Sequence, residues 1–216
     1  MTEHYKHAKT MHFLFSEGLQ NDDRMMPDEL CFDGKTVAIT EKRDGEGTNW
    51  YNNGYHARSM MGGHHPSRSW AKAEHCRVQN EIPEGWKIYG ENLYSKKAIY
   101  YEDLITYFEV IFIWDEDKNS LSLEEELKWC DKLGLIHVPI LEILTIKGND
   151  FSKIKEWSEK IIGEGKEGIV ARNIEPFNFK DFQYNVAKTV RKGHVQPDES
   201  HWMSRPVEPN KLKICL

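Results

Sequence analysis

A lysine followed two residues later by an acid and then by glycine is the feature of this sequence that most directly indicates chemistry. The residues are Lys42, Asp44 and Gly45, and they follow an alternating apolar segment. A lysine amine at a strand end can act as a nucleophile when nearby cations or a metal ion destabilise its ammonium form. Asp44 is an anion, which stabilises the ammonium form of a nearby lysine and raises its pKa. Asp44 is therefore better suited to contact a ribose or a metal-bound water. The same pattern also fits an ordinary surface lysine after a strand.

Three further basic side chains have the chemistry of phosphate ligands. Arg58 stands near the end of an expected strand, where a guanidinium can bind phosphate oxygens. Lys188 and Arg191 form a basic pair that could hold an α-phosphate and a departing pyrophosphate. If their segment is a strand, Lys188 shares a face with Val190, and Arg191 points to the other face unless the strand is ending. Solvated residues at strand ends would have the same pattern.

Two separated acids, Glu91 and Glu167, are flanked by glycines. Glycine lets the backbone approach a ligand closely. Such carboxylates fit one contact to a ribose hydroxyl and one to a magnesium-bound water. Each acid could also be an ordinary turn residue. The adjacent His64 and His65 lie on a polar turn, where neighbouring side chains point apart, so we do not expect them to bind a metal.

The composition indicates a folded intracellular protein. Hydrophobic residues make up 39% of the 216 residues, which is enough for a substantial core. The net charge of −6 means that any nucleic acid must be bound by local basic patches. The four cysteines show no CxxC pair, so we expect neither a zinc site nor a disulfide framework. The N-terminus is polar, and no segment approaches the roughly 20 apolar residues of a membrane span. We therefore expect a cytoplasmic protein that does not enter a membrane.

Periodicity along the chain predicts more strands than helices, in mixed order. The expected strands are 36–40, 55–59, 86–91, 107–115, 138–146, 167–172 and 184–190, and the expected helices are 66–79, 122–133 and 152–162. In 107–115, alternation places Phe108, Val110, Phe112 and Trp114 on one face. Segment 86–91 reads as a strand ending at a glycine. This order favours an α+β fold with largely antiparallel sheets around a cleft.

Taken together, these motifs resemble the covalent nucleotidyltransferase superfamily of polynucleotide ligases and mRNA capping enzymes. The resemblance is greatest to the small bacterial and phage-type RNA ligases and spans about residues 10–203. Six segments are similar, in order, to motif I, the following arginine motif, and motifs III, IIIa, IV and V: residues 42–49, 56–59, 89–94, 107–115, 167–172 and 188–196. Each motif alone is weak, whereas six in the right order are a strong signal.

The resemblance implies a fold and a set of roles. The fold would be an α+β nucleotidyltransferase domain, the ATP-grasp-like adenylation domain of ligases, with largely antiparallel sheets flanking an ATP cleft. Lys42 would become adenylylated, and Glu167 would also help to hold Mg²⁺ or Mn²⁺. ATP would be bound by Glu41, Asp44, Gly45, Arg58, Glu91, Ile111, Glu167, Lys188 and Arg191. Counting from Glu91, Ile111 takes the position of an adenine-packing ring, with Phe112 on the opposite face.

The implied activity is ATP-dependent joining of RNA ends that carry a 5′-phosphate and a 3′-hydroxyl, as in RNA repair. Few residues follow the last motif, so we expect residues 1–216 to form a single adenylation domain without an OB-fold or clamp domain. Such a protein would bind RNA alone or with a partner such as an end-healing kinase-phosphatase. Three alternatives remain open: a DNA ligase, a capping guanylyltransferase, and a non-catalytic nucleic-acid-binding module.

Overall fold

The computed structural model describes residues 3–19, 23–58, 60, 64–193 and 206–214. The chain divides into two compact units, each with one five-stranded sheet. Unit 1 comprises Met1–His7, Asp44–His137 and Pro197–Leu216, and unit 2 comprises Ala8–Arg43 and Val138–Gln196. The chain therefore passes from unit 2 to unit 1 directly after the predicted nucleophile Lys42 and its neighbour Arg43.

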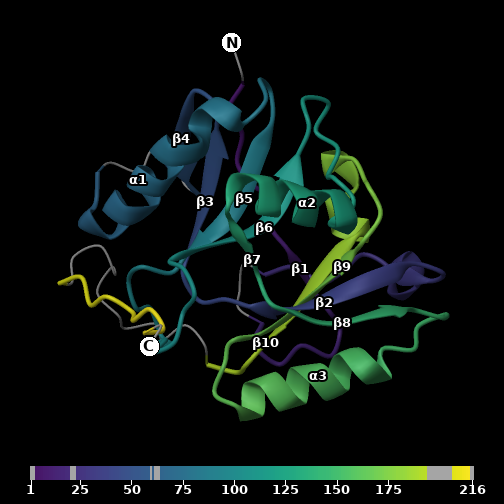
Figure 1. Cartoon of the computed structure of the whole chain (residues 1–216). Coiled ribbons are helices and arrows are strands. Elements are labelled where there is room, and N and C mark those ends of the chain that lie inside the picture. The colour runs from purple at the N-terminus through teal and green to yellow at the C-terminus, as the bar shows by residue number, and fades with distance from the viewer. Residues whose placement is uncertain (1–2, 20–22, 59, 61–63, 194–205, 215–216) are drawn as a thin grey trace. The chain divides into compact units, whose positions relative to one another are not determined.

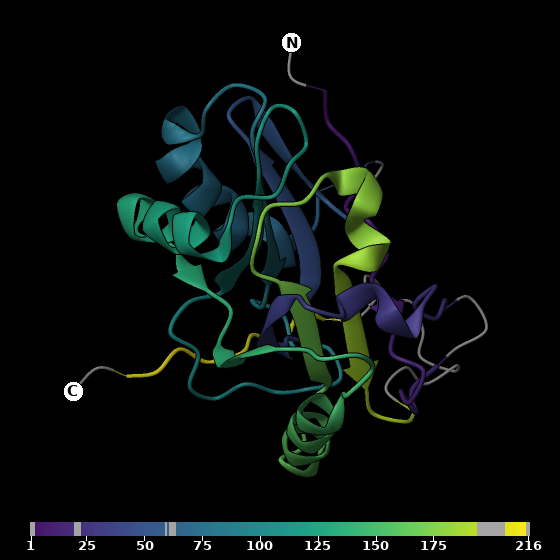
Figure 2. The ribbon, with the colours of Figure 1, turned by 90° about the vertical axis from the view of Figure 1, so that its right-hand side faces the viewer.

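The sheet of unit 2 has the strand order β1-β10-β9-β2-β8, and only the β1–β10 pair is parallel. The bounds are β1 Met11–His12, β2 Thr36–Lys42, β8 Ile140–Thr145, β9 Gly168–Asn173 and β10 Val186–Val190. Helix α3 (Ser152–Gly163) covers one face (Figure 1, Figure 2). There Ile154 and Ile161 pack with Ile39 and Ile169, so the alternate residues of β2 and β9 are left for the opposite face.

The sheet of unit 1 has the order β4-β3-β5-β6-β7. Its strands are β3 Glu46–Tyr51, β4 Gly54–Ala57, β5 Lys87–Asn92, β6 Phe108–Trp114 and β7 Ile136–His137. Helices α1 (Ser69–Val78) and α2 (Leu123–Leu133) contribute to one core with β3, β5 and β6. At the centre of this core, the Trp50 and Phe108 rings stack 3.7 Å apart.

Short 3-10 helices complete the two units. They are η1 Glu29–Phe32, η2 Pro66–Arg68, η3 Gln79–Glu81 and η4 Phe179–Tyr184. At the start of η2, the Nδ1 atom of His65 accepts a hydrogen bond from the Ser67 backbone N–H at 3.3 Å. This predicted polar turn therefore uses a histidine as a helix cap.

The α+β prediction with largely antiparallel sheets is confirmed, and so are the local signals behind it. Helix α2 begins at a complete capping box between Ser122 and Glu125 and ends at Gly134, whose φ of 63° suits a residue without a side chain. The part of the chain that the structure describes contains no helix long and apolar enough to cross a membrane.

Three predictions about strands were wrong or incomplete. Strand β3 was missed, because its polar, glycine-containing sequence lacks an apolar alternation. Gly90 lies inside β5 and does not end it, since Glu91 and Asn92 continue the pairing with β6. The four apolar residues of β6 do not share a face: Tyr89 pairs with Phe112 while Gly90 pairs with Val110, so Ile111 forms a bulge that shifts the alternation.

Candidate active site

Lys42 ends β2 in unit 2 and contacts the carboxylate of Glu167 through its Nζ atom. Lys42 pairs with Gly168, the first residue of β9, and Glu167 immediately precedes that strand. The Lys42 side chain is 24% exposed and that of Glu167 only 3%. The predicted nucleophile is thus held against a buried acid while it remains accessible.

Lys188 lies on the same face of this sheet as Lys42. It pairs with Val170, two residues along β9 from Gly168, the partner of Lys42. Residues paired across strands, and residues two apart, share a face, which here is opposite the face packed on α3. Two strand spacings and an offset of two residues separate the Cα atoms of Lys42 and Lys188 by about 12 Å. Two lysine side chains at that spacing can converge on one phosphate group.

Gly168 makes the close pairing beside Glu167 possible. A Cβ atom at this position would lie 2.0 Å from the carbonyl oxygen of Thr189, far inside van der Waals contact. One residue beyond the last pair of β9 and β10, the Arg191 N–H donates a hydrogen bond to the Glu167 carbonyl at 2.9 Å. Arg191 follows β10, as expected for a residue at a strand end, and its backbone ties that end to Glu167.

Lys188 also belongs to a buried network that the sequence did not reveal. Its Nζ lies 3.8 Å from Oδ1 of Asp23, and Oδ2 of Asp23 lies 3.2 Å from Nε2 of His12. The other ring nitrogen of His12 is 2.9 Å from the Ser16 hydroxyl. Burial, followed by the charge of Lys188, lowers the pKa of the fully buried His12, while Asp23 raises it. This network holds the amine end of the Lys188 side chain near Asp23.

The carboxylate of Glu41 is bound by two cations of unit 2. Arg43 donates to Oε1 at 2.7 Å, and Lys166 donates to Oε2 at 2.8 Å. Glu41 is 4% exposed, and its strand neighbour is Ile169. The ion pair with Lys166 connects the end of β2 to the residue before Glu167. A role of the Glu41 side chain in nucleotide binding stays a prediction.

In unit 1, Asp44, Gly45 and Glu91 come together at the end of β5. Oδ2 of Asp44 accepts hydrogen bonds from the backbone N–H groups of Ala98 and Ile99, both at 2.8 Å. The Gly45 N–H donates to Oε1 of Glu91 at 3.1 Å. A Cβ on Gly45 would lie 2.5 Å from the Asn92 carbonyl, so glycine is required for this approach. The three predicted residues therefore form one local cluster.

Arg58 follows β4 and is exposed. Its backbone N–H donates to the Gly47 carbonyl at 2.7 Å, which fixes where the side chain starts. A second arginine, Arg68, makes two hydrogen bonds to Glu46, at 2.8 and 2.5 Å, and is 6% exposed. Arg68 is therefore a structural arginine, while Arg58 has the exposure that a phosphate ligand needs.

The bulge in β6 changes which side chain of that strand lies on the same sheet face as Glu91. Along β5, Tyr89 and Glu91 alternate onto one face, and Phe112 pairs with Tyr89. A count of residues from Glu91 points to Ile111 only if side chains alternate between the two faces without interruption along β6. The register instead brings the Phe112 ring to the Glu91 face, and Ile111 occupies the bulge itself. Contact between Ile111 and adenine stays a prediction, and Phe112 is an additional candidate.

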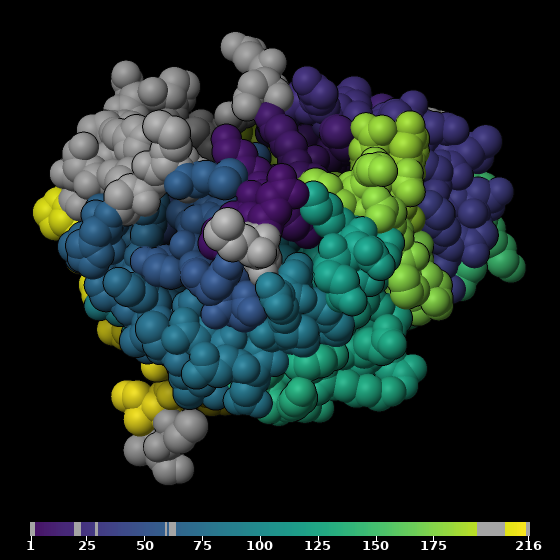
Figure 3. All heavy atoms as spheres, turned by 90° about the horizontal axis from the view of Figure 1, so that it is seen from above, coloured from purple at the N-terminus to yellow at the C-terminus, as the bar shows by residue number. Residues whose placement is uncertain are grey.

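The N-terminal segment lies on this same face of unit 1, which sequence analysis did not anticipate. The His7 ring stacks on Tyr89 with centroids 3.5 Å apart, and it lies 5.6 Å from Phe112. The His4 ring stacks on Tyr51 at 4.1 Å. Figure 3 shows the purple N-terminal segment at the surface, against blue side chains of unit 1. Burial raises the pKa of the Tyr89 hydroxyl, with a further rise from the charge of Glu91.

Lys97 is another unit 1 residue that no sequence pattern had marked. Burial lowers its pKa to about 8, against the opposing effect of Glu46, Asp44 and Glu91. A lysine in this environment loses its proton more easily than a surface lysine does.

The Glu167 carboxylate of unit 2 fits a divalent cation that is held mainly by the phosphate oxygens of a bound nucleotide. Mg²⁺ and Mn²⁺ are usually held by one or two carboxylates together with water and phosphate oxygens. Among the described residues, no group of three or more His, Cys, Asp or Glu side chains could enclose a metal ion. The buried Glu167 carboxylate beside Lys42 is the hard oxygen donor that such an open site requires.

Comparison with known families decides how this arrangement is classified. The model of the family described as RNA ligase matches residues 35–190, which include Lys42, Glu91, Glu167 and Lys188. The chain belongs to the RNA ligase family. No curated protein shows a significant sequence match to it.

Solved structures support the fold of this RNA ligase family member. An archaeal ATP-dependent RNA ligase has a TM-score of 0.59 and 16% identity, over 86% of this chain and 48% of its own. A protein from Aquifex aeolicus, described provisionally as an ATP-dependent DNA ligase, has a TM-score of 0.58 and 22% identity, over 85% and 49%. A Naegleria gruberi RNA ligase mutant solved with ATP and Mn has a TM-score of 0.54 and 18% identity, over 88% and 59%. The chain thus spans about half the length of the structures it matches.

Proposed function

We propose that this chain is an ATP-dependent RNA ligase that works through a covalent lysyl-AMP on Lys42. The contact between Lys42 and the buried Glu167, on a sheet face shared with Lys188, is the observation that carries the proposal. Membership of the RNA ligase family supports it. We further propose that residues 1–216 act as one adenylation module for RNA repair in the cytoplasm.

In the first step, the neutral Lys42 amine attacks the α-phosphorus of ATP in line with the pyrophosphate. An N–P bond forms, the P–O bond to pyrophosphate breaks, the leaving oxygen takes the electron pair, and the attacking nitrogen loses one proton to solvent. Lys188 neutralises charge on the phosphate oxygens, and Glu167 orients the Lys42 nitrogen. A divalent cation at Glu167 would supply further charge neutralisation and favour the unprotonated amine. Mg²⁺ and Mn²⁺ both suit this role, and Naegleria ligase mutants are solved with ATP or AMP and Mn.

The remaining steps use the adenylate to join RNA ends. The 5′-phosphate of one end attacks the α-phosphorus, which releases Lys42 and forms a pyrophosphate linkage to AMP. The 3′-hydroxyl of the other end then attacks the 5′-phosphate phosphorus, and AMP leaves. Dividing the condensation in this way replaces one difficult reaction by three in-line displacements. RNA ends that lack these groups would require an end-healing kinase-phosphatase as a partner.

The deciding experiment is incubation with α-labelled ATP and Mg²⁺ or Mn²⁺, followed by a denaturing gel. We expect an acid-labile label on the wild-type chain, and none on Lys42→Ala, because Lys42 supplies the amine that contacts Glu167. Circular dichroism of Lys42→Ala should match that of the wild type. A label that persists on Lys42→Ala, or no label on folded AMP-free wild type, would refute the proposal.

A DNA ligase is the second candidate, since the Aquifex aeolicus protein with a similar fold carries that description. Matched nicked substrates that differ only in whether the 3′-hydroxyl strand is RNA or DNA separate the two activities. Faster sealing from the RNA strand supports the RNA ligase. Labelling by GTP in place of ATP would instead indicate a capping guanylyltransferase, and RNA binding without any label a non-catalytic module.

A further inference from the structure

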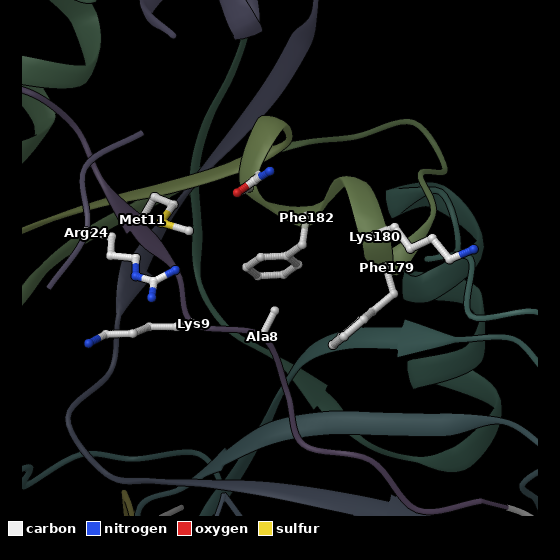
Figure 4. Close-up of a pocket in the computed structure, with 8 residues that line it drawn as sticks. Ala8, Lys9, Met11, Arg24, Phe179, Lys180 and Phe182 are labelled. Carbon is white, nitrogen blue, oxygen red and sulfur yellow. The ribbon is translucent and has the colours of Figure 1, made fainter. Parts of the chain in front are cut away.

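An open pocket of about 470 Å³ lies in unit 2, outside the Lys42–Glu167 contact. Its lining combines an N-terminal segment, a residue beyond it and the 3-10 helix η4: Ala8, Lys9, Met11, Arg24, Phe179, Lys180, Phe182 and Gln183. In Figure 4, Lys9 and Arg24 lie on one side of the Phe182 ring, and Phe179 and Lys180 lie on the other. The volume is in the range of small-ligand sites.

The chemistry of this lining matches a nucleotide within a strand. Phe179 is half-buried and offers a ring face, while Phe182, 2% exposed, forms a rigid apolar wall. Arg24 and Lys180 are exposed cations on the two sides. Proteins bind single-stranded nucleic acid by stacking bases on aromatic rings and by holding the backbone with cations. In a chain with net charge −6, such a local basic and aromatic pocket selects for polyanions.

The pocket connects directly to the phosphate-binding side of the proposed site within unit 2. Lys9 lies 3.6 Å from Asp23, the same carboxylate that approaches Lys188. Met11, in the lining, pairs with Ala187, and the next pair is His12 with Lys188. Met11 and Ala187 pack on the α3 side of the sheet, opposite Lys188. The route from the pocket to Lys188 therefore passes Lys9 and Asp23 at the sheet edge.

We propose that this pocket binds one nucleotide of the RNA strand that flanks the ligation junction, an inference that rests on the proposed function. The base packs on Phe179 against the Phe182 wall. The flanking phosphates are bound by Arg24 together with Lys9 on one side, and by Lys180 on the other. This subsite gives the adenylation module a hold on RNA that is separate from ATP.

Two variants test the subsite by removing the charges and the ring separately. They are the double variant Arg24→Gln/Lys180→Gln and the single variant Phe179→Leu. The matched control is Lys153→Gln/Lys160→Gln, which removes two positive charges from α3 in the same unit. Circular dichroism melting of each variant monitors folding.

The first readout is the affinity for a short fluorescent 5′-phosphorylated single-stranded RNA, measured by anisotropy across salt concentrations. Loss of two phosphate contacts should reduce the slope of log K against log salt by about 1.4, and Phe179→Leu should weaken binding by roughly 5- to 150-fold with little change of slope. The control should keep the wild-type slope and affinity.

The second readout is labelling by α-labelled ATP, which separates this proposal from the proposed function. We expect labelling of both pocket variants within about twofold of wild type, because the pocket holds RNA. Wild-type RNA affinity and salt slope in both pocket variants would overturn the subsite. Equal losses of labelling and RNA binding would overturn it too, since the pocket would then serve ATP. Absence of label on wild type would refute only the ligase activity, because anisotropy still reports on the pocket.

Discussion

The two units hold the acids of the candidate site in different ways. In unit 2, cations and carboxylates approach one another directly, as in Lys42 with Glu167 and Lys188 with Asp23. In unit 1, the predicted carboxylates accept backbone hydrogen bonds, Asp44 from Ala98 and Ile99, and Glu91 from Gly45. Direct charge pairs can be exchanged for a substrate phosphate or a metal ion, whereas backbone-bound acids keep a fixed geometry. We therefore propose that unit 2 carries the reacting groups and that unit 1 carries nucleotide recognition.

Among the variants that test this difference between the units, Glu167→Gln is expected to have the largest effect on the rate of adenylylation. Removing the charge beside Lys42 while keeping the shape should slow adenylylation by roughly 100- to 1000-fold, because a preorganised electrostatic partner is lost. Single-turnover labelling at several Mn²⁺ concentrations measures it. The comparison variant Glu142→Gln alters an acid on β8 that accepts a hydrogen bond from Trp157, and it should label normally. Wild-type rates for Glu167→Gln at low Mn²⁺ would contradict the assigned role.

In unit 1, Phe112→Ala tests recognition. Because Phe112 shares the Glu91 face, its removal should raise the KM for ATP about tenfold with little change in kcat. Ile111→Ala is the matched variant, and it should have the smaller effect. If Ile111→Ala has the larger effect on KM, then the count from Glu91 identified the adenine contact correctly and the bulge is irrelevant to it.

Asp23→Asn tests whether a charge pair in unit 2 positions Lys188. We expect adenylylation to fall about tenfold, as is typical when an outer partner of a functional group is removed, with Asp23→Glu recovering part of the rate. The loss should appear in kcat. Asp23 raises the pKa of His12, so Asp23→Asn should lower that pKa further, which NMR titration of the ring can measure. An unchanged His12 titration together with normal kcat would leave Asp23 without a positioning role.

The smallest effect concerns Lys87, a buried lysine of unit 1 whose Nζ lies 3.5 Å from the centroid of the Tyr5 ring. Burial, followed by the charge of Lys118, lowers its pKa from 10.5 to about 6. The unfolded chain therefore binds more protons than the folded one between these values, and stability should rise with pH across that window.

Lys87→Met removes this linkage while conserving the shape of the side chain. We expect the Tm at pH 7 to rise by a few degrees, and the gain to shrink as the pH approaches 10. Thermal melts of both proteins over that range measure it. Lys188→Met, in the charge-paired unit, should show no comparable gain, and equal gains from both lysines would remove the distinction between the units.

Much of the fold could be predicted because its signals are local. The alternation of 36–40 gave β2, and the box from Ser122 to Glu125 gave the start of α2, since both depend on neighbours within a few residues. Strand β3 lacked such a signal: its residues Gly47 and Asn49 are weak strand formers that pairing with β4 and β5 holds extended. The short parallel strand β1 is likewise defined by its partner.

The sequence by itself determined which lysine is the candidate nucleophile and the order of acids and bases along the chain around it, because these residue types have few chemical uses in that spacing. Only the tertiary structure decided that Glu167 contacts Lys42 and that Asp23 approaches Lys188. It also decided that Phe112, and not Ile111, pairs with Tyr89. These outcomes depend on strand register, on one inserted residue, and on segments distant in the chain. They are set by the packing that buries the most apolar surface while it leaves the backbone N–H and C=O groups hydrogen-bonded. A local sequence pattern does not contain this information, because it depends on segments that are distant in the chain.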